Sequence, residues 1–155
     1  MPNKYKFKFK FNWVLNGKLA IGTCPRYEED LIKIKENHIK SIFGLCDSSE
    51  AIYPDNLQAI FKLERYVLPD HKSDKLVSSE DLLIARNTLN KLLQEGSVFL
   101  HCVAAMERSP LVCMAWLIKY KNLSITQSLD YMMSINKGTN PLPSQLMVLN
   151  DPILK

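Results

Sequence analysis

The sequence lacks a long apolar run, and its first residues lack the apolar segment of a signal peptide. No stretch of eighteen or more apolar residues occurs, and residues 1–10 are studded with lysine instead. These absences argue against a membrane-spanning helix and a cleaved leader. We therefore expect a cytoplasmic protein without a membrane partner.

Cysteine is also scarce and irregularly spaced. The four cysteines are Cys24, Cys46, Cys102 and Cys113. They do not form the dense framework of a small secreted protein, and no two are close enough for a zinc ribbon. We expect mostly free thiols, no metal and no cofactor, so any special cysteine must be identified by its surroundings.

Charge of either sign is not concentrated. The net charge is +4, and it comes mainly from scattered lysines, so nucleic acid is not the expected partner. The exception is residues 4–11, where lysines alternate with aromatic residues. This period of two predicts a strand with its aromatic side chains inward. Its lysines could form a basic surface for an acidic partner, or they could guard a solvated edge strand, which is the interpretation we favour.

The chain also lacks repeats and low-complexity linkers, and 46% of its residues are hydrophobic against 23% charged. One globular domain over residues 1–155 follows. Besides residues 4–11, the predicted strands are residues 14–15 and 19–21 around an Asn16-Gly17 turn, 39–45, 62–68 and 97–100. The predicted helices are residues 27–37, one capped by Ser78 with Asp81, one beginning near Pro110, one capped by Ser124 with Gln127, and 144–149, while residues 54–60 form a helix or a loop. This alternation predicts an α/β fold with a mainly parallel central sheet flanked by helices.

The most informative segment lies between the last predicted strand and the helix at Pro110. The apolar residues 97–100 lead directly to His101 and Cys102, and a short loop precedes the helix. Amides of the loop and the first helical turn point toward the cysteine, and the helix N-terminus adds about half a positive charge. A thiolate and a phosphate are therefore both favoured at this place.

Five residues separate Cys102 from Arg108, which allows the loop to form a cradle around a phosphate. Loop amides can contact the phosphate oxygens while the guanidinium binds two of them. Ser109 could donate its hydroxyl to the sulfur, and His101 would hydrogen-bond beneath the loop. The predicted phosphate-binding loop comprises His101, Val103, Ala104, Ala105, Met106 and Glu107. The alternative is a buried structural cysteine in a strand-to-helix turn.

The pattern His-Cys, five residues, Arg-Ser resembles the signature loop of the protein tyrosine phosphatase superfamily, especially its small dual-specificity members. Residues 11–20 resemble the opening of small atypical dual-specificity phosphatases. The resemblance implies a mainly parallel sheet between helices, with the loop at its carboxyl edge. It also implies hydrolysis of phosphate monoesters through a cysteinyl-phosphate, with Cys102 as nucleophile and Arg108 holding the phosphate.

This family also needs a general acid, which the resemblance places on a loop before the cysteine. Asp70 follows a predicted strand that stops at Pro69, and it is our choice. It would protonate the leaving oxygen and then activate the water that hydrolyses the intermediate. Asp74 on the same loop is the alternative, and an ordinary turn aspartate is the third interpretation.

The loop departs from the family pattern at two positions. Ala105 stands where the family usually has glycine, and if the loop needs a positive φ there, alanine costs about 1 kcal/mol or more. Glu107 would repel a phosphate, so we expect its side chain to turn away and orient a neighbouring group. Both departures allow a second hypothesis, a catalytically weak module that only binds phosphate.

Substrate class is less constrained. The residues between Cys102 and Arg108 include no lysine or arginine, which argues against polyanionic ligands such as inositol phospholipids or RNA 5′ ends. We expect a phosphoprotein or phosphopeptide substrate, in a pocket shallow enough for phosphoserine, phosphothreonine and phosphotyrosine, and binding of phosphate, sulfate or vanadate in the loop. A lipid, nucleotide or RNA phosphatase on the same fold is the alternative.

Two further features have functional and ordinary interpretations. The charged residues around Asp70 could attract acidic substrates or merely solvate the loop; they are His71, Lys72 and Lys75. Cys46 or Cys113 could form a reversible disulfide with an oxidised Cys102, although buried inert thiols are the usual case.

Overall fold

The computed structural model describes residues 8–155. Residues 4–7, the first half of the predicted aromatic and lysine strand at residues 4–11, therefore lie outside the described residues. Residues 8–10 are not part of a strand, and strand β1 (Phe11–Leu15) begins only at Phe11. Lys10 still holds the chain beside the sheet, because its amide donates to Oγ1 of Thr23 over 2.9 Å and its carbonyl accepts from the Thr23 amide over 3.2 Å.

Five strands form one sheet in the order β1-β2-β5-β3-β4. Besides β1, they are β2 (Leu19–Gly22), β3 (Ser41–Gly44), β4 (Lys62–Arg65) and β5 (Val98–His101). Only the β1–β2 pair is antiparallel, so the mainly parallel α/β sheet predicted from the sequence is confirmed. Strand β5 is the last strand in the sequence but lies in the middle of the sheet, between β2 and β3. The loop that follows β5 therefore has a neighbouring strand on each side.

A tight turn joins β1 to β2, as the Asn16-Gly17 pair predicts. The amide of Lys18 donates to the carbonyl of Leu15 over 2.9 Å, and Gly17 has a φ of 76°. This left-handed conformation is available to glycine at little cost. The predicted hairpin is confirmed.

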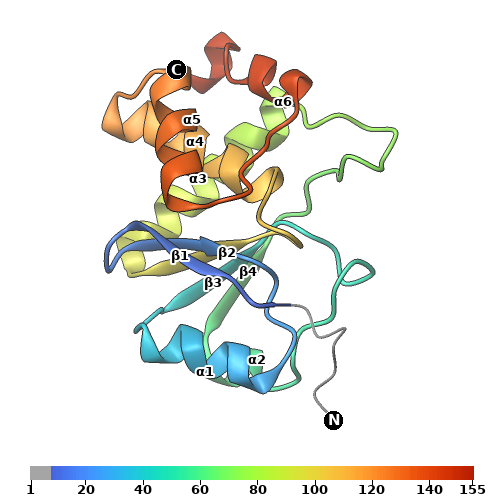
Figure 1. Cartoon of the computed structure of the whole chain (residues 1–155), viewed down its shortest axis with the longest axis vertical. Coiled ribbons are helices and arrows are strands. Elements are labelled where there is room, and N and C mark those ends of the chain that lie inside the picture. Colours follow the sequence, from blue (N-terminus) through green and yellow to red (C-terminus); the bar gives the residue numbers. More distant parts are fainter. Residues whose placement is uncertain (1–7) are drawn as a thin grey trace.

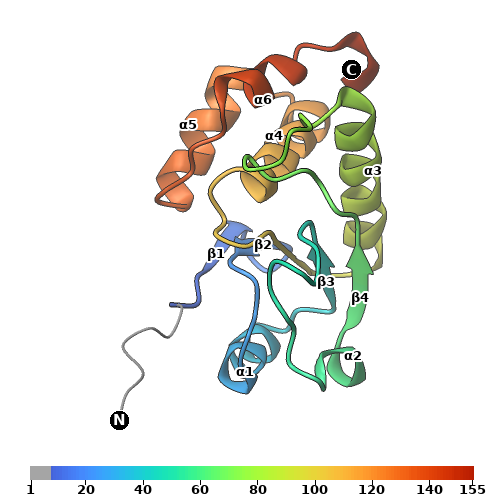
Figure 2. The same cartoon turned by 90° about the vertical axis from the view of Figure 1, so that its right-hand side faces the viewer.

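Helices cover both faces of the sheet (Figures 1 and 2). One face carries α1 (Glu28–Glu36) and α2 (Leu57–Ile60), and the other carries α3 (Ser79–Glu95), α4 (Arg108–Lys121), α5 (Ile125–Ile135) and α6 (Pro143–Val148). A final 3-10 turn, Pro152–Leu154, was not predicted. Among residues 8–155, no helix is both long enough and apolar enough to cross a bilayer.

The central strand is buried on both faces, as its apolar sequence predicts. Phe99 packs into the core on the α1 side, whereas Val98 and Leu100 belong to the core beneath α3 and α4. All four residues of β5 are buried. The strand that carries Cys102 at its end is therefore anchored by two cores.

The helix starts follow their predicted caps with one correction. Ser124 and Gln127 form a complete capping box. Ser78 accepts from the amide of Asp81 over 3.0 Å, but the carboxylate of Asp81 accepts from the hydroxyl of Tyr66 over 2.7 Å. The capping box predicted at Ser78 is therefore only half formed, because a tertiary partner occupies the side chain that would complete it.

Strand β4 also ends earlier than the predicted residues 62–68. The backbone continues beside β3, since the amides of Tyr66 and Leu68 donate to the carbonyls of Gly44 and Leu45 over 3.0 and 2.9 Å. Because β3 itself ends at Gly44, the regular ladder stops there. The loop that carries Asp70 leaves the sheet at this edge.

Candidate active site

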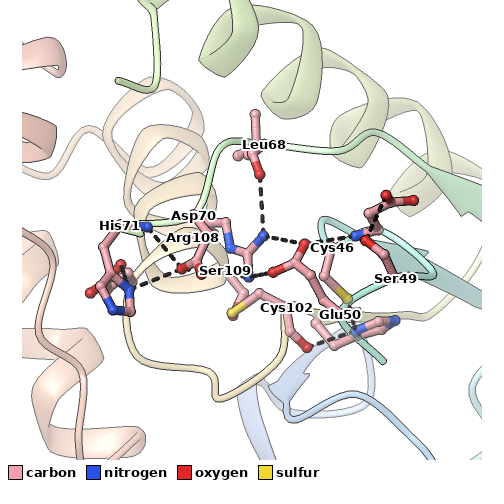
Figure 3. Close-up of polar contacts among 12 residues, drawn as sticks. Cys46, Ser49, Glu50, Leu68, Asp70, His71, Cys102, Arg108 and Ser109 are labelled. Atoms are coloured by element: carbon pink, nitrogen blue, oxygen red, sulfur yellow. Dashed lines mark hydrogen bonds and ion pairs between the residues drawn. The ribbon is translucent and has the colours of Figure 1, made fainter. Parts of the chain in front are cut away.

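Cys102 lies at the carboxyl end of the sheet, between β5 and the first turn of α4. Its side chain is buried, and its Sγ lies 3.2 Å from Oγ of Ser109 (Figure 3). Helix α4 begins at Arg108, so Pro110 occupies its first turn, where a missing N–H costs nothing. The strand, loop and helix arrangement predicted around the cysteine is the one observed.

Arg108 points into the same site and is almost completely buried. Its Nη1 donates to the carbonyl of Leu68 over 3.2 Å, and its two terminal nitrogens donate to the Glu50 carboxylate over 3.1 and 2.8 Å (Figure 3). Burial alone would lower the pKa of Arg108, but its hydrogen bonds to Glu50 and the nearby Cys102 sulfur raise the pKa above its ordinary value. The guanidinium is therefore a fixed positive charge beside the sulfur.

Glu50 is a site residue that the sequence analysis missed. Burial opposes its ionisation, but donation by Arg108 and by the Asp47 amide over 2.9 Å holds the pKa of Glu50 below its ordinary value. Glu50 follows β3, the parallel neighbour of β5. The carboxyl ends of neighbouring parallel strands meet at one edge, so an acidic residue soon after residues 39–45 was the signal that could have found it.

Asp70 reaches the site from the loop after β4. Its Oδ1 accepts from the amide of His71 over 2.8 Å and lies 4.0 Å from Nη2 of Arg108. Asp70 lines the same cleft as Cys102 and Arg108, whereas Asp74, among the described residues, does not. The geometry therefore favours Asp70 over Asp74 as the carboxyl group of this site.

The cleft has a volume of about 560 Å³. Its lining combines the phosphate loop, the Asp70 loop and the carboxylate that holds Arg108. The lining residues are Glu50, Asp70, His71, Lys72, Cys102, Val103, Ala104, Met106, Glu107 and Arg108. Five of the six residues from Val103 to Arg108 therefore face one cavity, and the exception is Ala105.

The histidine before the cysteine is buried beneath the loop. Nδ1 of His101 lies 2.9 Å from the carbonyl oxygen of Cys102, and Nε2 lies 2.6 Å from the hydroxyl of Tyr53. Burial raises the pKa of Tyr53, and the guanidinium of Arg65 lies 4.6 Å from the centre of its ring. Tyr53 is a second residue that the sequence analysis missed, and it fixes the plane of the imidazole.

The outer side of the loop is held by backbone and amide contacts. Ala105 has a φ of 59°, so the left-handed conformation on which its predicted cost depends is present. Nδ2 of Asn136 donates to the carbonyl of Ala105 over 2.8 Å, and the amide of Asn140 donates to the carbonyl of Met106 over 2.7 Å. The amide of Cys24 donates to the carbonyl of Val103 over 3.2 Å. Three loop carbonyls are thereby turned outward.

Glu107 does not leave the cleft, in contrast to the expectation. It lines the cavity, and its Oε2 lies 3.3 Å from Nδ1 of His71. Glu107 does lie against a neighbouring group, as expected, and that group is His71. Because His71 itself lines the cleft, the side chain of Glu107 stays there, and the expectation that it turns away is wrong. Asp70, His71 and Glu107 place three potential metal-ligand atoms within 4.8 Å of one another.

A second group with metal-ligand atoms within 4.8 Å of one another lies beneath the loop. It comprises Cys24, Cys46 and His101, and Sγ of Cys46 lies 3.9 Å from Nδ1 of His101. A hydrogen bond from Cys24, with His101 and Arg108 nearby, lowers the pKa of Cys46 to about 5 despite its burial. Burial raises the pKa of Cys113 inside α4. A disulfide of either Cys46 or Cys113 with Cys102 stays a prediction.

Known proteins resemble this chain in sequence and in fold. Phosphatidylglycerophosphate phosphatase PTPMT2 of Arabidopsis thaliana is 24% identical over 151 residues, which are 96% of this chain and 66% of that protein, so the chain spans slightly less than two thirds of this relative. The crystal structure of Tk-PTP in its active form matches with a TM-score of 0.77 and 22% identity, over 90% of this chain and 92% of that one. PTPMT1 in complex with PI(5)P matches with a TM-score of 0.76 and 17% identity, over 90% and 91%.

These two structures are similar to the chain in fold. The family described as dual specificity phosphatase, catalytic domain, matches residues 21–151, which include β3 to β5, all six α-helices and every residue that lines the cleft. The chain therefore belongs to the dual-specificity phosphatase catalytic-domain family.

Proposed function

We propose that this chain hydrolyses phosphate monoesters without a metal, through a cysteinyl-phosphate intermediate. One observation carries the proposal: the sulfur of Cys102, the guanidinium of Arg108 and the carboxyl group of Asp70 open into one cleft at the N-terminus of α4. A nucleophile, an anion-binding group and a proton donor are the three parts that this chemistry requires.

In the first step, the thiolate of Cys102 attacks phosphorus and the bond to the leaving oxygen breaks. Arg108 and the loop amides bind the equatorial oxygens, whose charge is best compensated in the transition state. Asp70 gives its proton to the leaving oxygen, which departs as an alcohol or phenol. Glu50 contributes by holding the guanidinium in a fixed plane.

In the second step, the ionised Asp70 accepts a proton from water, which attacks the cysteinyl-phosphate and releases inorganic phosphate. The sulfur leaves as a thiolate, and Ser109, at 3.2 Å, can donate its hydroxyl to it. His101 supports the loop from below through its contact with the Cys102 carbonyl. The cycle leaves every group in its starting protonation state.

The proposed substrate is a phosphoprotein or phosphopeptide of the cytoplasm. The loop adds no lysine or arginine to Arg108, and Lys72 is the one lysine among residues 8–155 that lines the cleft. A single dianionic phosphate suits this charge better than a polyphosphorylated headgroup does. A phosphorylated lipid is the second candidate, because the relative PTPMT2 is a phosphatidylglycerophosphate phosphatase.

Turnover of an aryl phosphate in the presence of EDTA tests the reaction. Cys102→Ser should abolish turnover, since a hydroxyl is a far weaker nucleophile at neutral pH than a thiolate. Asp70→Asn should slow turnover most when the leaving group is poorly acidic. Rapid mixing of wild type should release a burst of phenol and then a steady rate. Binding of phosphate with neither burst nor turnover would instead identify a phosphate-binding module.

A substrate panel separates the two substrate classes. Phosphopeptides carrying phosphotyrosine, phosphoserine or phosphothreonine should be turned over with higher kcat/KM than phosphatidylglycerophosphate in detergent micelles. Cys102→Ser is the control for contaminating phosphatases in both arms. A higher kcat/KM for the lipid would replace the proposed substrate while leaving the proposed reaction intact.

A further inference from the structure

Two loops from different parts of the chain meet at the rim of the cleft through one imidazole. Nδ1 of His71 lies 2.9 Å from Oδ1 of Asp70 on its own loop and 3.3 Å from Oε2 of Glu107 on the phosphate loop. Figure 3 shows His71 beside Asp70, at the edge of the site away from Glu50. The imidazole therefore links the segment that carries the proposed acid to the segment that binds the phosphate.

The carboxylate of Glu107 is the group that a positive charge on this imidazole would stabilise most. Its Oε2 is buried, and no residue among 8–155 donates a hydrogen bond to it, although Nδ1 of His71 lies within ion-pair distance. The contact is thus electrostatic rather than an aligned hydrogen bond. A buried carboxylate oxygen without a donor is costly, and the negative charge repels any anion brought into the same cleft.

The charges around the cleft show why this repulsion matters. Three carboxylates line it, namely those of Glu50, Asp70 and Glu107, and the proposed reaction adds the thiolate of Cys102. Among residues 8–155, Arg108 and Lys72 are the permanent cations that line the cleft, and His71 adds a positive charge when it is protonated. Arg108 already donates to Glu50 with both terminal nitrogens. Without a charge on His71, the cavity that must accept a phosphate dianion is therefore strongly negative.

We propose that His71 is a positioning residue whose imidazolium neutralises Glu107, so that the loop can bind a phosphate dianion, and fastens the Asp70 loop over the cleft. This inference rests on the proposed function. Its two effects are separable. Neutralisation of Glu107 changes anion affinity, whereas fastening of the Asp70 loop changes the rate with poor leaving groups. A direct contact between His71 and the phosphate would also affect affinity, but it would not depend on Glu107.

A double-mutant cycle between His71 and Glu107 tests the neutralisation. The probe is tungstate, a tetrahedral oxyanion that needs no turnover, titrated calorimetrically into the full chain in EDTA. His71→Ala should weaken tungstate binding by roughly fivefold, the size expected for a partly exposed ion pair. Glu107→Gln should bind at least as tightly as wild type. The double variant His71→Ala/Glu107→Gln should return to within about twofold of wild type, because no carboxylate is left to neutralise.

Two variants serve as controls. His71→Lys keeps a cation at the rim and should retain most of the affinity. Lys72→Ala removes a neighbouring cation of the same cleft, and it should weaken tungstate binding by the same factor in wild type as in the Glu107→Gln background. Circular dichroism melts of each variant should show that the fold is retained under assay conditions.

The fastening of the Asp70 loop is tested by leaving groups. His71→Ala and Glu107→Gln should each lower kcat for phenyl phosphate by roughly tenfold while changing kcat for p-nitrophenyl phosphate by less than about threefold, because only the poor leaving group needs a placed proton donor. A double variant that binds tungstate as weakly as His71→Ala would overturn the neutralisation, and unchanged leaving-group dependence would overturn the fastening. If tungstate fails to bind wild type, the proposed function itself falls, and the two failures are thereby distinguished.

Discussion

Arg108 is buried, Glu50 is partly exposed, and the two form an ion pair in which each charge depends on the other. Glu50→Gln should reduce the free energy of unfolding by about 1–3 kcal/mol at neutral pH, because a charged hydrogen-bond acceptor of Arg108 is replaced by a neutral one. It should also reduce kcat/KM for an aryl phosphate, since the guanidinium loses its fixed plane. Chemical denaturation and steady-state kinetics measure the two effects, with the exposed Glu36→Gln in α1 as the control.

The same pair predicts a pH dependence of stability. The pKa of Glu50 is lower in the folded protein than its ordinary value of 4.5. Its contribution to stability is therefore complete above that ordinary value and is lost as the pH falls through the lowered pKa. Melting temperatures of wild type and Glu50→Gln should differ most near neutral pH and converge in acid. A difference that stays constant down to pH ~3 would contradict this linkage.

Ala105 carries a local strain that glycine would relieve. A left-handed φ costs an L-residue about 1–2 kcal/mol, whereas the buried methyl group of this alanine contributes about 0.8 kcal/mol. Ala105→Gly should therefore raise the free energy of unfolding by up to about 1 kcal/mol. Ala104→Gly, at a neighbouring position whose φ is not positive, should lower it by a similar amount. The midpoints of urea unfolding measure both changes, provided that the m-value is the same in each variant. Equal losses of stability in Ala105→Gly and Ala104→Gly would show that Ala105 carries no strain.

At the scale of elements, the phosphate loop is shaped by the segment that follows α5. Asn136 is fully buried, and its Nδ2 donates to the carbonyl of Ala105 and to Oγ1 of Thr139. Asn136→Ala should cost about 1–3 kcal/mol, because a buried carbonyl loses its donor. It should also weaken tungstate binding, since the loop amides lose their orientation.

The neighbouring Asn140 offers a matched control for this prediction. It reaches the loop through its backbone amide, which donates to the carbonyl of Met106 over 2.7 Å. Asn140→Ala keeps that hydrogen bond, and the side chain is exposed. Asn140→Ala should therefore have nearly the tungstate affinity of wild type by calorimetry and nearly its free energy of unfolding by denaturation. If Asn140→Ala lost as much of either as Asn136→Ala does, a specific role for Asn136 would be contradicted.

The elements that could be predicted from the sequence are those with local causes. Gly17 sets the hairpin, Ser124 and Gln127 cap α5, and the apolar residues before His101 form the central strand. The half-formed cap at Ser78 shows where local reasoning ends, since Tyr66 reaches Asp81 across the fold. The cysteine-to-arginine loop could be predicted for the same local reason: its residues are contiguous.

The rest of the site depends on contacts between distant segments. Glu50, Tyr53 and Asn136 occupy no motif, and each contacts Arg108, His101 or the loop only because the chain folds back. The predicted orientation of the Glu107 side chain was wrong for a related reason. Repulsion from phosphate could be foreseen from its place beside Arg108, but the arrival of His71 from the Asp70 loop could not.

At the scale of the whole molecule, the sheet order brings these segments together. Because β5 lies between β2 and β3, the loop that follows it is flanked by the segments after both neighbours. Cys24 follows β2, Glu50 follows β3 and Asp70 follows β4, while Asn136, directly after α5, reaches the loop from the helical side. An anion bound in the loop would therefore contact a segment that is held by contacts with most of the fold.

This arrangement predicts that an oxyanion stabilises the entire domain. Tungstate at one hundred times its dissociation constant should add about 2.7 kcal/mol to the free energy of unfolding. For a domain of this length, that corresponds to a rise in the melting temperature of about 5–11 °C in one cooperative transition. Differential scanning calorimetry measures it, with sodium chloride at equal ionic strength as the control for screening. Arg108→Lys should lose most of the shift, because a lysine cannot reproduce the bidentate fork. If tungstate instead sharpened or split the transition without raising its midpoint, the loop would be energetically separate from the two cores that flank β5.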